Sequence, residues 1–409
     1  MANAFLDGDD AERARAAIDA IAVDLETGET DWGVGLGQGL ADRALFYAWR
    51  GVTFADDAAT ARAQGLVHCL VEVAEHASAE LGLLRGCAGV GWTIAHLSDR
   101  ESADVALLTI DATILGALEE RSWRFDYDLI SGLVGLGVYA LARVPGEPAH
   151  RMLERILDHL EASAVRTSAG HAWHTPPSLL PAWQRELAPD GYFNYGLAHG
   201  VPGVIALLAA MIEAGEHETR ARALLEPAVT WLLNGELAPG LHARFPMWDS
   251  GVAPPILTRA AWCYGDPGVA IALARAARAT GSAQTREAAA RIARAVAGRQ
   301  EANAGIIDPA ICHGALGLAH VLRRLSSFVA DPDVRRAAID WTRRGLAMRR
   351  EGEGFGGFPP HSAHSKLPDQ SAWLSASTLL TGSAGIGLVL LSMLDDECDD
   401  WDAPLLTNL

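Results

Sequence analysis

The sequence predicts an all-α fold, an α/α toroid of seven inner and seven outer helices in one domain over residues 1–409. Two observations predict it. A Gly-x-x-Gly motif followed by an apolar segment recurs along the chain, and an amphipathic segment precedes each copy. Repetition of one unit is typical of folds in which each unit buries its apolar face against its neighbours.

The glycine motif marks where the inner helices are expected to begin. Each copy leads into a segment such as VIALLAAMI (204–212), whose apolar residues on nearly all sides are typical of a helix buried all round. The first copy has Asp42 where a second glycine is usual, so we expect altered packing of the first inner helix. The first residues of the copies are Gly39, Gly86, Gly132, Gly200, Gly265, Gly314 and Gly382.

The segment before each motif has the pattern of an outer helix. In TREAAARIARAVAGRQ (285–300), Ile292 and Val296 recur four residues apart. The arginines of the segment can reach solvent, and they are Arg286, Arg291, Arg294 and Arg299. This spacing predicts an amphipathic helix with one buried stripe. The seven segments are 11–25, 58–76, 104–120, 150–162, 218–234, 285–298 and 333–349.

Stacked helix pairs can form an open solenoid or a closed ring. An open solenoid needs polar capping repeats at its ends. Here the first and last apolar segments, ALFYAW (44–49) and IGLVLLSML (386–394), are as apolar as the middle ones. We therefore expect the ring to close.

Composition narrows the class of protein. A net charge of −18 argues against nucleic acid as the main partner, because phosphate binding needs a basic surface. No apolar run approaches the roughly 20 residues needed to span a bilayer, and the first residues lack a signal-peptide pattern. Five cysteines, an odd number in a large chain, do not indicate a disulfide framework. We expect a cytoplasmic protein that does not span a membrane and keeps its thiols reduced.

Reactive side chains recur at the residues just before the first glycine of a motif. His199 stands one residue before it in the fourth unit, and Cys263 stands two before it in the fifth. Cys312 and His313 are two and one residues before it in the sixth. Equivalent positions of adjacent units lie at one end of a ring, so these side chains should converge. Two cysteines and one histidine form a zinc set with an open fourth position, although buried structural cysteines would give the same pattern. We expect one zinc ion per chain.

Two further residues are placed near this group. Asp128, four residues before its motif, is expected either to orient the imidazole of His199 or to cap an inner helix. Arg259, four residues before Cys263, is expected either to bind an anionic group or to pair with a surface acid.

The other cysteines and histidines fit simpler roles. Cys69 lies in a helical segment and is expected to be a small core residue. Cys87, inside a glycine motif, can approach the centre of the ring, and Cys398 lies in an acidic tail. The HAWH (171–174) and HSAH (361–364) motifs have metal-like spacing, but their Pro, Gly and Ser neighbours predict loops with solvated histidines.

The motifs together resemble those of the LanC lanthipeptide cyclases and the related LanC-like proteins. They are GLAHGVPG (196–203), RAAWCYGDPG (259–268), CHGALG (312–317) and, more loosely, YDLISGLVG (127–135). The resemblance, spread over the whole chain, implies the toroid fold, zinc on the residues above and acid/base chemistry at His199. The other residues implied to line the site are Asp128, Arg259 and Tyr264.

The resemblance implies a zinc-dependent lanthionine synthetase C-type cyclase. In such an enzyme, peptide Cys thiols add to dehydroalanine or dehydrobutyrine of a ribosomal precursor peptide and close (methyl)lanthionine thioether rings. The dehydrated precursor peptide is then the main partner, and a dehydratase and a transporter are candidate partners in a biosynthetic complex. In this reading His199 protonates the enolate left by the addition, and Arg259 or Tyr264 steadies the enolate oxygen.

Other functions remain open at this stage. A LanC-like enzyme that adds glutathione or another small thiol to dehydrated protein residues would share every site residue. A non-catalytic scaffold would use zinc only to staple the toroid, which would leave His199 and Asp128 idle. A protein prenyltransferase β-subunit fits less well, because its usual metal set includes an Asp that the motif does not supply.

Overall fold

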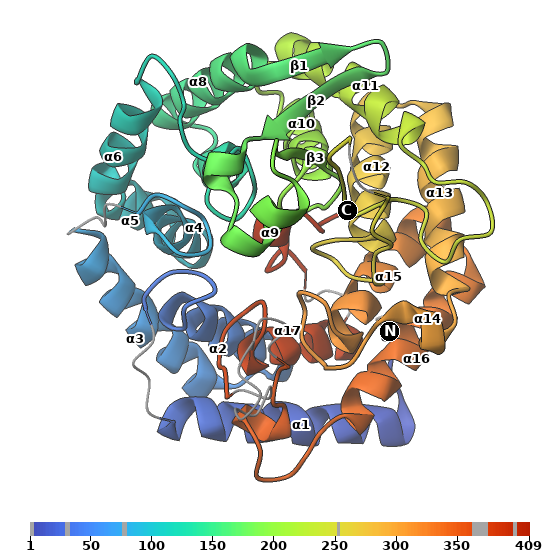
Figure 1. Cartoon of the computed structure of the whole chain (residues 1–409). Coiled ribbons are helices and arrows are strands. Elements are labelled where there is room, and N and C mark those ends of the chain that lie inside the picture. Colours follow the sequence, from blue (N-terminus) through green and yellow to red (C-terminus); the bar gives the residue numbers. More distant parts are fainter. Residues whose placement is uncertain (1–3, 29–32, 76–79, 252–253, 362–374, 396–398) are drawn as a thin grey trace.

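The inner helices form a closed ring inside a second ring of helices in the computed structural model, which describes residues 4–28, 33–75, 80–251, 254–361, 375–395 and 399–409. Figure 1 shows the two concentric rings along their common axis and confirms the predicted toroid. Each inner helix begins at its glycine motif and is buried over most of its length. The inner helices are α2 (Leu40–Phe54), α4 (Cys87–Leu97), α7 (Leu133–Ala142), α10 (Val201–Glu213), α12 (Asp266–Thr280), α15 (Ala315–Val329) and α17 (Ser383–Leu394).

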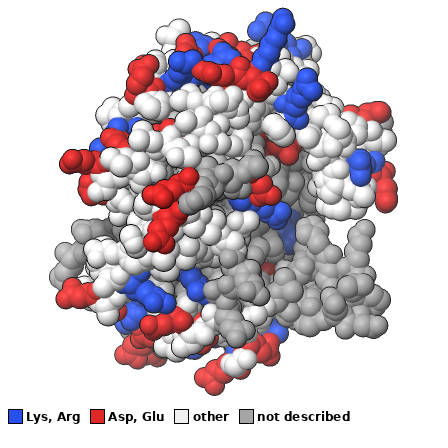
Figure 2. Space-filling model, turned by 90° about the vertical axis from the view of Figure 1, so that its left-hand side faces the viewer, with Lys and Arg blue, Asp and Glu red and all other residues white. Residues whose placement is uncertain are grey.

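The outer helices follow the seven amphipathic segments. The third segment is divided into two helices at Leu107, where the backbone (φ −99°, ψ 3°) leaves the helical region. Acidic and basic side chains are interspersed on the outer wall, as the amphipathic pattern predicts (Figure 2). The outer helices are α1 (Gly8–Thr27), α3 (Asp57–Ala74), α5 (Arg100–Ala106) with α6 (Leu108–Leu118), α8 (Glu147–Ser163), α11 (Glu218–Asn234), α13 (Ala283–Ala297) and α16 (Pro332–Ala347).

The glycine motif is required by the close packing of a loop on the helix that follows it. A Cβ at Gly317 would overlap the carbonyl oxygen of Ile311, and one at Gly268 would overlap that of Trp262. In both cases the obstructing carbonyl belongs to the residue six positions earlier. Each loop therefore folds back over the start of its own inner helix, which holds the residues just before the motif in a fixed place.

The first unit has Asp42 at the position of the second glycine. Asp42 is fully buried, and its carboxylate accepts a hydrogen bond of 2.8 Å from the backbone N–H of Gly37. Burial raises the pKa of Asp42 to about 7, although several backbone hydrogen bonds oppose the shift. The expected change in packing is thus a buried carboxyl group, and α2 still forms.

The ring closes between its last and first units. Helix α17 packs against both α1 and α2. The backbone N–H groups of Phe5 and Leu6 donate to the carbonyl oxygen of Met393 at 3.0 and 3.1 Å. This closure is the outcome that the apolar terminal segments predicted. Within the described residues, no helix is long and apolar enough to cross a membrane.

A small antiparallel sheet, not predicted from the sequence, lies in the connections on either side of α10 (Figure 1). The HAWH motif lies in its second strand, so the expectation of a loop there was wrong. The third strand ends at Asn194, just before the segment that carries His199, which places the sheet beside the reactive end. Strands and short helices outside the rings are β1 (Ala164–Thr167), β2 (Gly170–Thr175), η1 (Pro177–Leu179), α9 (Ala182–Leu187), β3 (Tyr192–Asn194), β4 (Trp248–Asp249), α14 (Glu301–Ala304), η2 (Phe355–Gly357) and η3 (Ala403–Leu405).

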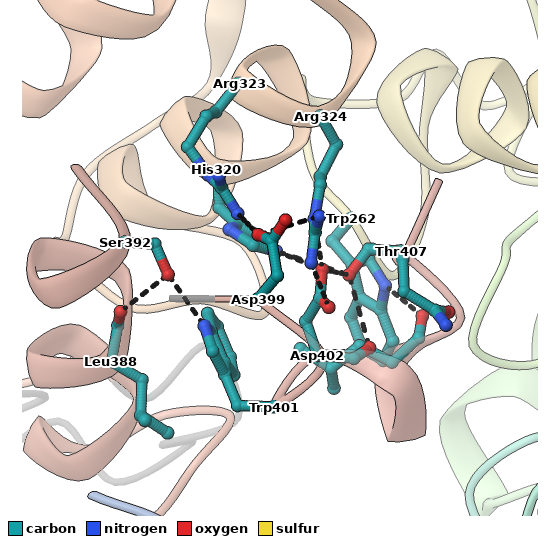
Figure 3. A network of polar contacts seen from close by, with 12 residues as sticks. Trp262, His320, Arg323, Arg324, Leu388, Ser392, Asp399, Trp401, Asp402 and Thr407 are labelled. Carbon is teal, nitrogen blue, oxygen red and sulfur yellow. Dashed lines mark hydrogen bonds and ion pairs between the residues drawn. The ribbon is translucent and has the colours of Figure 1, made fainter. Parts of the chain in front are cut away.

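The C-terminal residues 399–409 lie inside the ring (Figure 1). The fully buried carboxylate of Asp402 accepts two hydrogen bonds from Arg324, of 2.6 and 2.8 Å, and lies 2.8 Å from Nε2 of His320 (Figure 3). The indole N–H of Trp262 donates to the carbonyl oxygen of Leu405 at 3.0 Å. Because Trp262 precedes Cys263, this segment supports the loop at the reactive end.

Candidate metal centre and acid/base pair

A chain of backbone hydrogen bonds brings the residues before the motifs together at one end of the toroid. The N–H of Ala198 donates to the carbonyl of Cys263, and the N–H of Cys263 donates to that of Cys312, both at 3.3 Å. The N–H of Cys312 in turn donates to Leu380 at 2.8 Å. These four residues all stand two positions before a first glycine, so the convergence expected from the repeat is present.

Three side chains form a group with metal-ligand chemistry. The ligand atoms of Cys263, Cys312 and His313 all lie within 4.8 Å of one another. Both cysteines are free and partly buried. A hydrogen bond from Cys312 lowers the pKa of Cys263 well below its usual range, although burial opposes the shift. One of the two sulfurs is therefore held as a thiolate, the form that binds metals.

A buried carboxylate lies behind the histidine of this group. Asp308 is fully buried, and its Oδ2 lies 3.3 Å from Nε2 of His313. Its oxygens also accept hydrogen bonds from the backbone N–H groups of Ala310 (3.2 Å) and His361 (3.0 Å). Burial disfavours the charged form of His313, but its contacts with Asp308 and Cys263 outweigh this and raise its pKa to about 9. Asp308 thus fixes the ring and leaves its other nitrogen, Nδ1, free for a ligand.

A second pair lies in the adjacent units. Nδ1 of His199 is 2.6 Å from Oδ2 of Asp128, whose Oδ1 accepts the backbone N–H of Ser131 at 2.9 Å. The carboxylate is only 7% exposed, whereas the imidazole is 37% exposed. Burial lowers the pKa of His199, but the hydrogen bond and charge of Asp128 outweigh it, so that the pKa is raised. Helix α7 is capped by Gly132 without a side-chain bond, so Asp128 orients an imidazole and caps no helix.

Tyr264 and Arg259 complete the group. The ring of Tyr264 stacks on His199 with centroids 5.4 Å apart, and its hydroxyl accepts a hydrogen bond from Nδ2 of Asn194 at 3.4 Å. Burial raises the pKa of Tyr264 well above its usual value, so its hydroxyl keeps its proton. The hydrogen bond with Cys263 raises the pKa of Cys312, and the positive charge of Arg259 opposes this shift. No described carboxylate forms an ion pair with Arg259. Among the described residues, therefore, the expected pairing of Arg259 with a surface acid is not seen.

Sequence reasoning missed three polar residues around this group. Asp308 and Asn194 are described above, and Asp126 lies beside Asp128 and His199. Burial, followed by the charge of Asp128, raises the pKa of Asp126 to about 6. All three, like Arg259, stand six positions before the first glycine of their units. That shared position was the signal available in the sequence.

The remaining cysteines and histidines lie elsewhere. Cys69 is exposed on α3, so the expectation of a core residue was wrong. Cys87 is buried at the start of α4, where burial raises the pKa of its thiol to about 11. The histidines of HAWH are partly buried in β2. Of HSAH only His361 is described, and its backbone binds Asp308; His364 and Cys398 lie outside the described residues.

Fold and site together define a class of protein: an α/α toroid with a Cys₂His group and a His–Asp pair at one end. A family model described as lanthionine synthetase C-like protein matches residues 30–406. The chain therefore belongs to the lanthionine synthetase C-like family.

Individual relatives are distant. The nisin biosynthesis protein NisC of Lactococcus lactis subsp. lactis is 25% identical over 211 residues, which cover 46% of this chain and 49% of that protein. The match thus spans about half of that relative's length. The solved structure of nisin cyclase shares the fold with a TM-score of 0.77 at 19% identity, covering 96% of this chain and 97% of that one. An α-1,6-mannanase of Salegentibacter sp. HEL1_6 aligns with a TM-score of 0.48 at 11% identity, over 96% of this chain and 100% of that one.

Proposed function

We propose that this protein is a zinc-dependent lanthipeptide cyclase. It would add Cys thiols of a dehydrated precursor peptide to dehydroalanine or dehydrobutyrine residues and so close thioether rings. The observation that carries the proposal is the Cys₂His group, with ligand atoms within 4.8 Å, beside the 2.6 Å pair of His199 and Asp128. The similarity to a nisin biosynthesis protein and to nisin cyclase supports the same class of reaction.

The side chains of the group suit zinc. Two sulfurs and one imidazole are ligands that zinc prefers, and three protein ligands leave a fourth position for a substrate. Cys263, Cys312 and His313 would hold the ion, with Asp308 orienting the imidazole. Zinc, when bound, supplies a positive centre that ionises a coordinated thiol. A free thiol has a pKa of about 8.5 and is only a few per cent ionised at pH 7. Ionisation by zinc would therefore supply the thiolate that attacks the dehydrated residue.

The chain's own residues would complete the addition. The sulfur of the substrate thiolate attacks the β-carbon of the dehydrated residue, and the electron pair of the double bond moves toward the carbonyl oxygen. His199, charged and oriented by Asp128, then donates a proton to the α-carbon. The imidazole recovers the proton that the substrate thiol lost, through solvent. The net change is addition of S–H across one carbon–carbon double bond.

The oxygen that gains charge during this step needs donors nearby. The guanidinium of Arg259 carries no competing ion pair with a described residue, and Tyr264 keeps its hydroxyl proton. Both would steady the enolate oxygen, which is the effect of preorganised donors at a developing charge. The stacking of Tyr264 on His199 would keep the donor and the acid in one place.

Zinc content and ring closure, measured on the same variants, test this function. Alanine at Cys263, Cys312 or His313 should remove one zinc equivalent and abolish cyclisation, while the toroid stays folded because its core does not depend on the site. Cys69→Ala is the matched control, since this thiol is free but exposed on the outer wall. Full zinc content in a triple variant of the three residues would refute the assignment.

The same assay separates peptide cyclisation from addition of a small thiol. A synthetic peptide with one dehydroalanine and one Cys should lose its reactivity toward a thiol-capping reagent without a change in mass. A peptide with dehydroalanine alone should gain no mass from glutathione in the presence of the protein. A protein-dependent glutathione adduct, with no ring closure, would favour the LanC-like small-thiol function instead.

A further inference from the structure

A second group of metal-ligand side chains lies at the opposite end of the toroid. His150, Glu216 and His217 offer ligand atoms that are all within 4.8 Å of one another. His150 lies in the first turns of α8, and the other two residues lie in the turn between α10 and α11. Inner helices begin at the reactive end and outer helices begin at the other end, so this group is remote from the Cys₂His site. It joins two neighbouring units of the ring.

His150 contacts both other side chains of the group. Nδ1 of His150 lies 2.9 Å from Oε2 of Glu216, whose side chain is 15% exposed. The His150 side chain is 53% exposed and stacks on the ring of His217 with centroids 4.2 Å apart.

The other imidazole is already set for a ligand. Nε2 of His217 lies 3.0 Å from the carbonyl oxygen of His150. A carbonyl only accepts hydrogen bonds, so Nε2 carries the proton and Nδ1 keeps a lone pair. Donation of the second ring N–H to a backbone carbonyl is the usual arrangement of metal-binding histidines. His217 also adopts a left-handed conformation (φ 46°, ψ 36°), as Ala55 and Ala330 do in the corresponding turns between inner and outer helices.

We propose that His150, Glu216 and His217 form a second zinc site, which ties the turn after α10 to the start of α8. Two imidazole nitrogens and one carboxylate suit zinc, with water in the fourth position. Calcium and magnesium would need more oxygen ligands than the group offers. Glu147, three residues before His150 on the same face of α8, lines with it an open cavity of about 570 Å³, so His150 is accessible from solvent.

Metal counting on the full chain tests this site separately from the proposed cyclase site. After equilibration with buffered free zinc, the wild type should hold two ions and a His150→Ala/His217→Asn variant one. Asparagine is chosen at 217 because it tolerates the left-handed conformation. His68→Ala is the matched control, because His68 is an exposed histidine 3.6 Å from Glu72 that belongs to no metal-ligand group among the described residues, and the variant should still hold two ions.

Cobalt replacement and thermal unfolding assign the ions to their sites. The His150→Ala/His217→Asn variant should keep the thiolate-to-cobalt absorption of the Cys₂His site and its cyclase activity, and it should lose the part of the zinc-dependent rise in Tm that comes from the second site. A Cys263→Ala/Cys312→Ala variant should lose that absorption and keep the part that comes from the second site. A zinc count that the histidine changes leave unaltered, or an ion lost in the His68 control, would overturn the second site. An unchanged zinc count after the cysteine changes would refute the cyclase site alone.

Discussion

Replacement of Asp128 by asparagine should shift the pH dependence of ring closure. Burial by itself lowers the pKa of His199, and the bond to Asp128 reverses this. The contact is short, 2.6 Å, and the carboxylate is 7% exposed, so water screens it little. A hydrogen bond to a charged group contributes about 1.5–3 kcal/mol, and 1.36 kcal/mol corresponds to one pKa unit. The pKa of His199 should therefore fall in the variant, because the contact that raises it is lost and burial remains.

The sign of the effect follows from the role of His199. A general acid must be protonated, so the rate falls as pH rises through its pKa. In Asp128→Asn that fall should begin at a lower pH than in the wild type. Asp126→Asn is the matched control. Asp126 raises the pKa of His199 only through its charge and less than Asp128 or Cys263 does, so its loss should shift the fall in rate less. His199→Asn should keep zinc and slow ring closure by roughly 10²–10⁴.

The assay is the initial rate of ring closure between about pH 5.5 and 9, followed by thiol capping and mass spectrometry. Zinc content should be measured on each variant at every pH, so that loss of metal is not mistaken for loss of the acid. Superimposable profiles of the wild type and Asp128→Asn would refute the orienting role of the carboxylate. Wild-type rates in His199→Asn would remove the histidine from the reaction and leave the zinc-stapled scaffold as the better account.

Three more changes probe the metal centre and the fold. Asp308→Asn should weaken zinc binding about 10- to 100-fold in a competition assay with a chelator, whereas unaltered affinity would show that the imidazole needs no buried partner. Asp42→Asn should raise the free energy of unfolding at pH 8. Folding raises the pKa of the Asp42 carboxyl from 3.8 to about 7, so the wild type loses about 1.4 kcal/mol of stability for each pH unit between these values. The gain should vanish below about pH 4 in thermal unfolding, and a pH-independent gain would contradict this origin. Gly317→Ala should destabilise the fold by about 1–3 kcal/mol or more through overlap with a loop carbonyl, whereas Gly65→Ala, in the open part of α3, should stabilise it by up to about 1 kcal/mol in denaturant unfolding.

The repeat explains why the rings were predictable. An inner helix buried on every side must be apolar all round, and an outer helix buried on one side must be amphipathic, so each ring leaves its own pattern. The sheet leaves no such pattern. Its strands are two to six residues long, as in Trp248–Asp249 and Gly170–Thr175. Runs this short carry too few residues for alternation between faces to be recognised.

The candidate site was predictable only in part for a related reason. Position relative to the motif says at which end of the ring a side chain lies, but not which neighbour it contacts. Asp308 contacts His313 of its own unit, whereas Asn194 contacts Tyr264 of the next unit. Both stand six residues before a first glycine. Whether such a residue turns to its own unit or to the next depends on loop length and on how closely the loop packs on its helix. The sequence therefore identifies the residues that can react, and the packing of loops between units selects the residues that orient them.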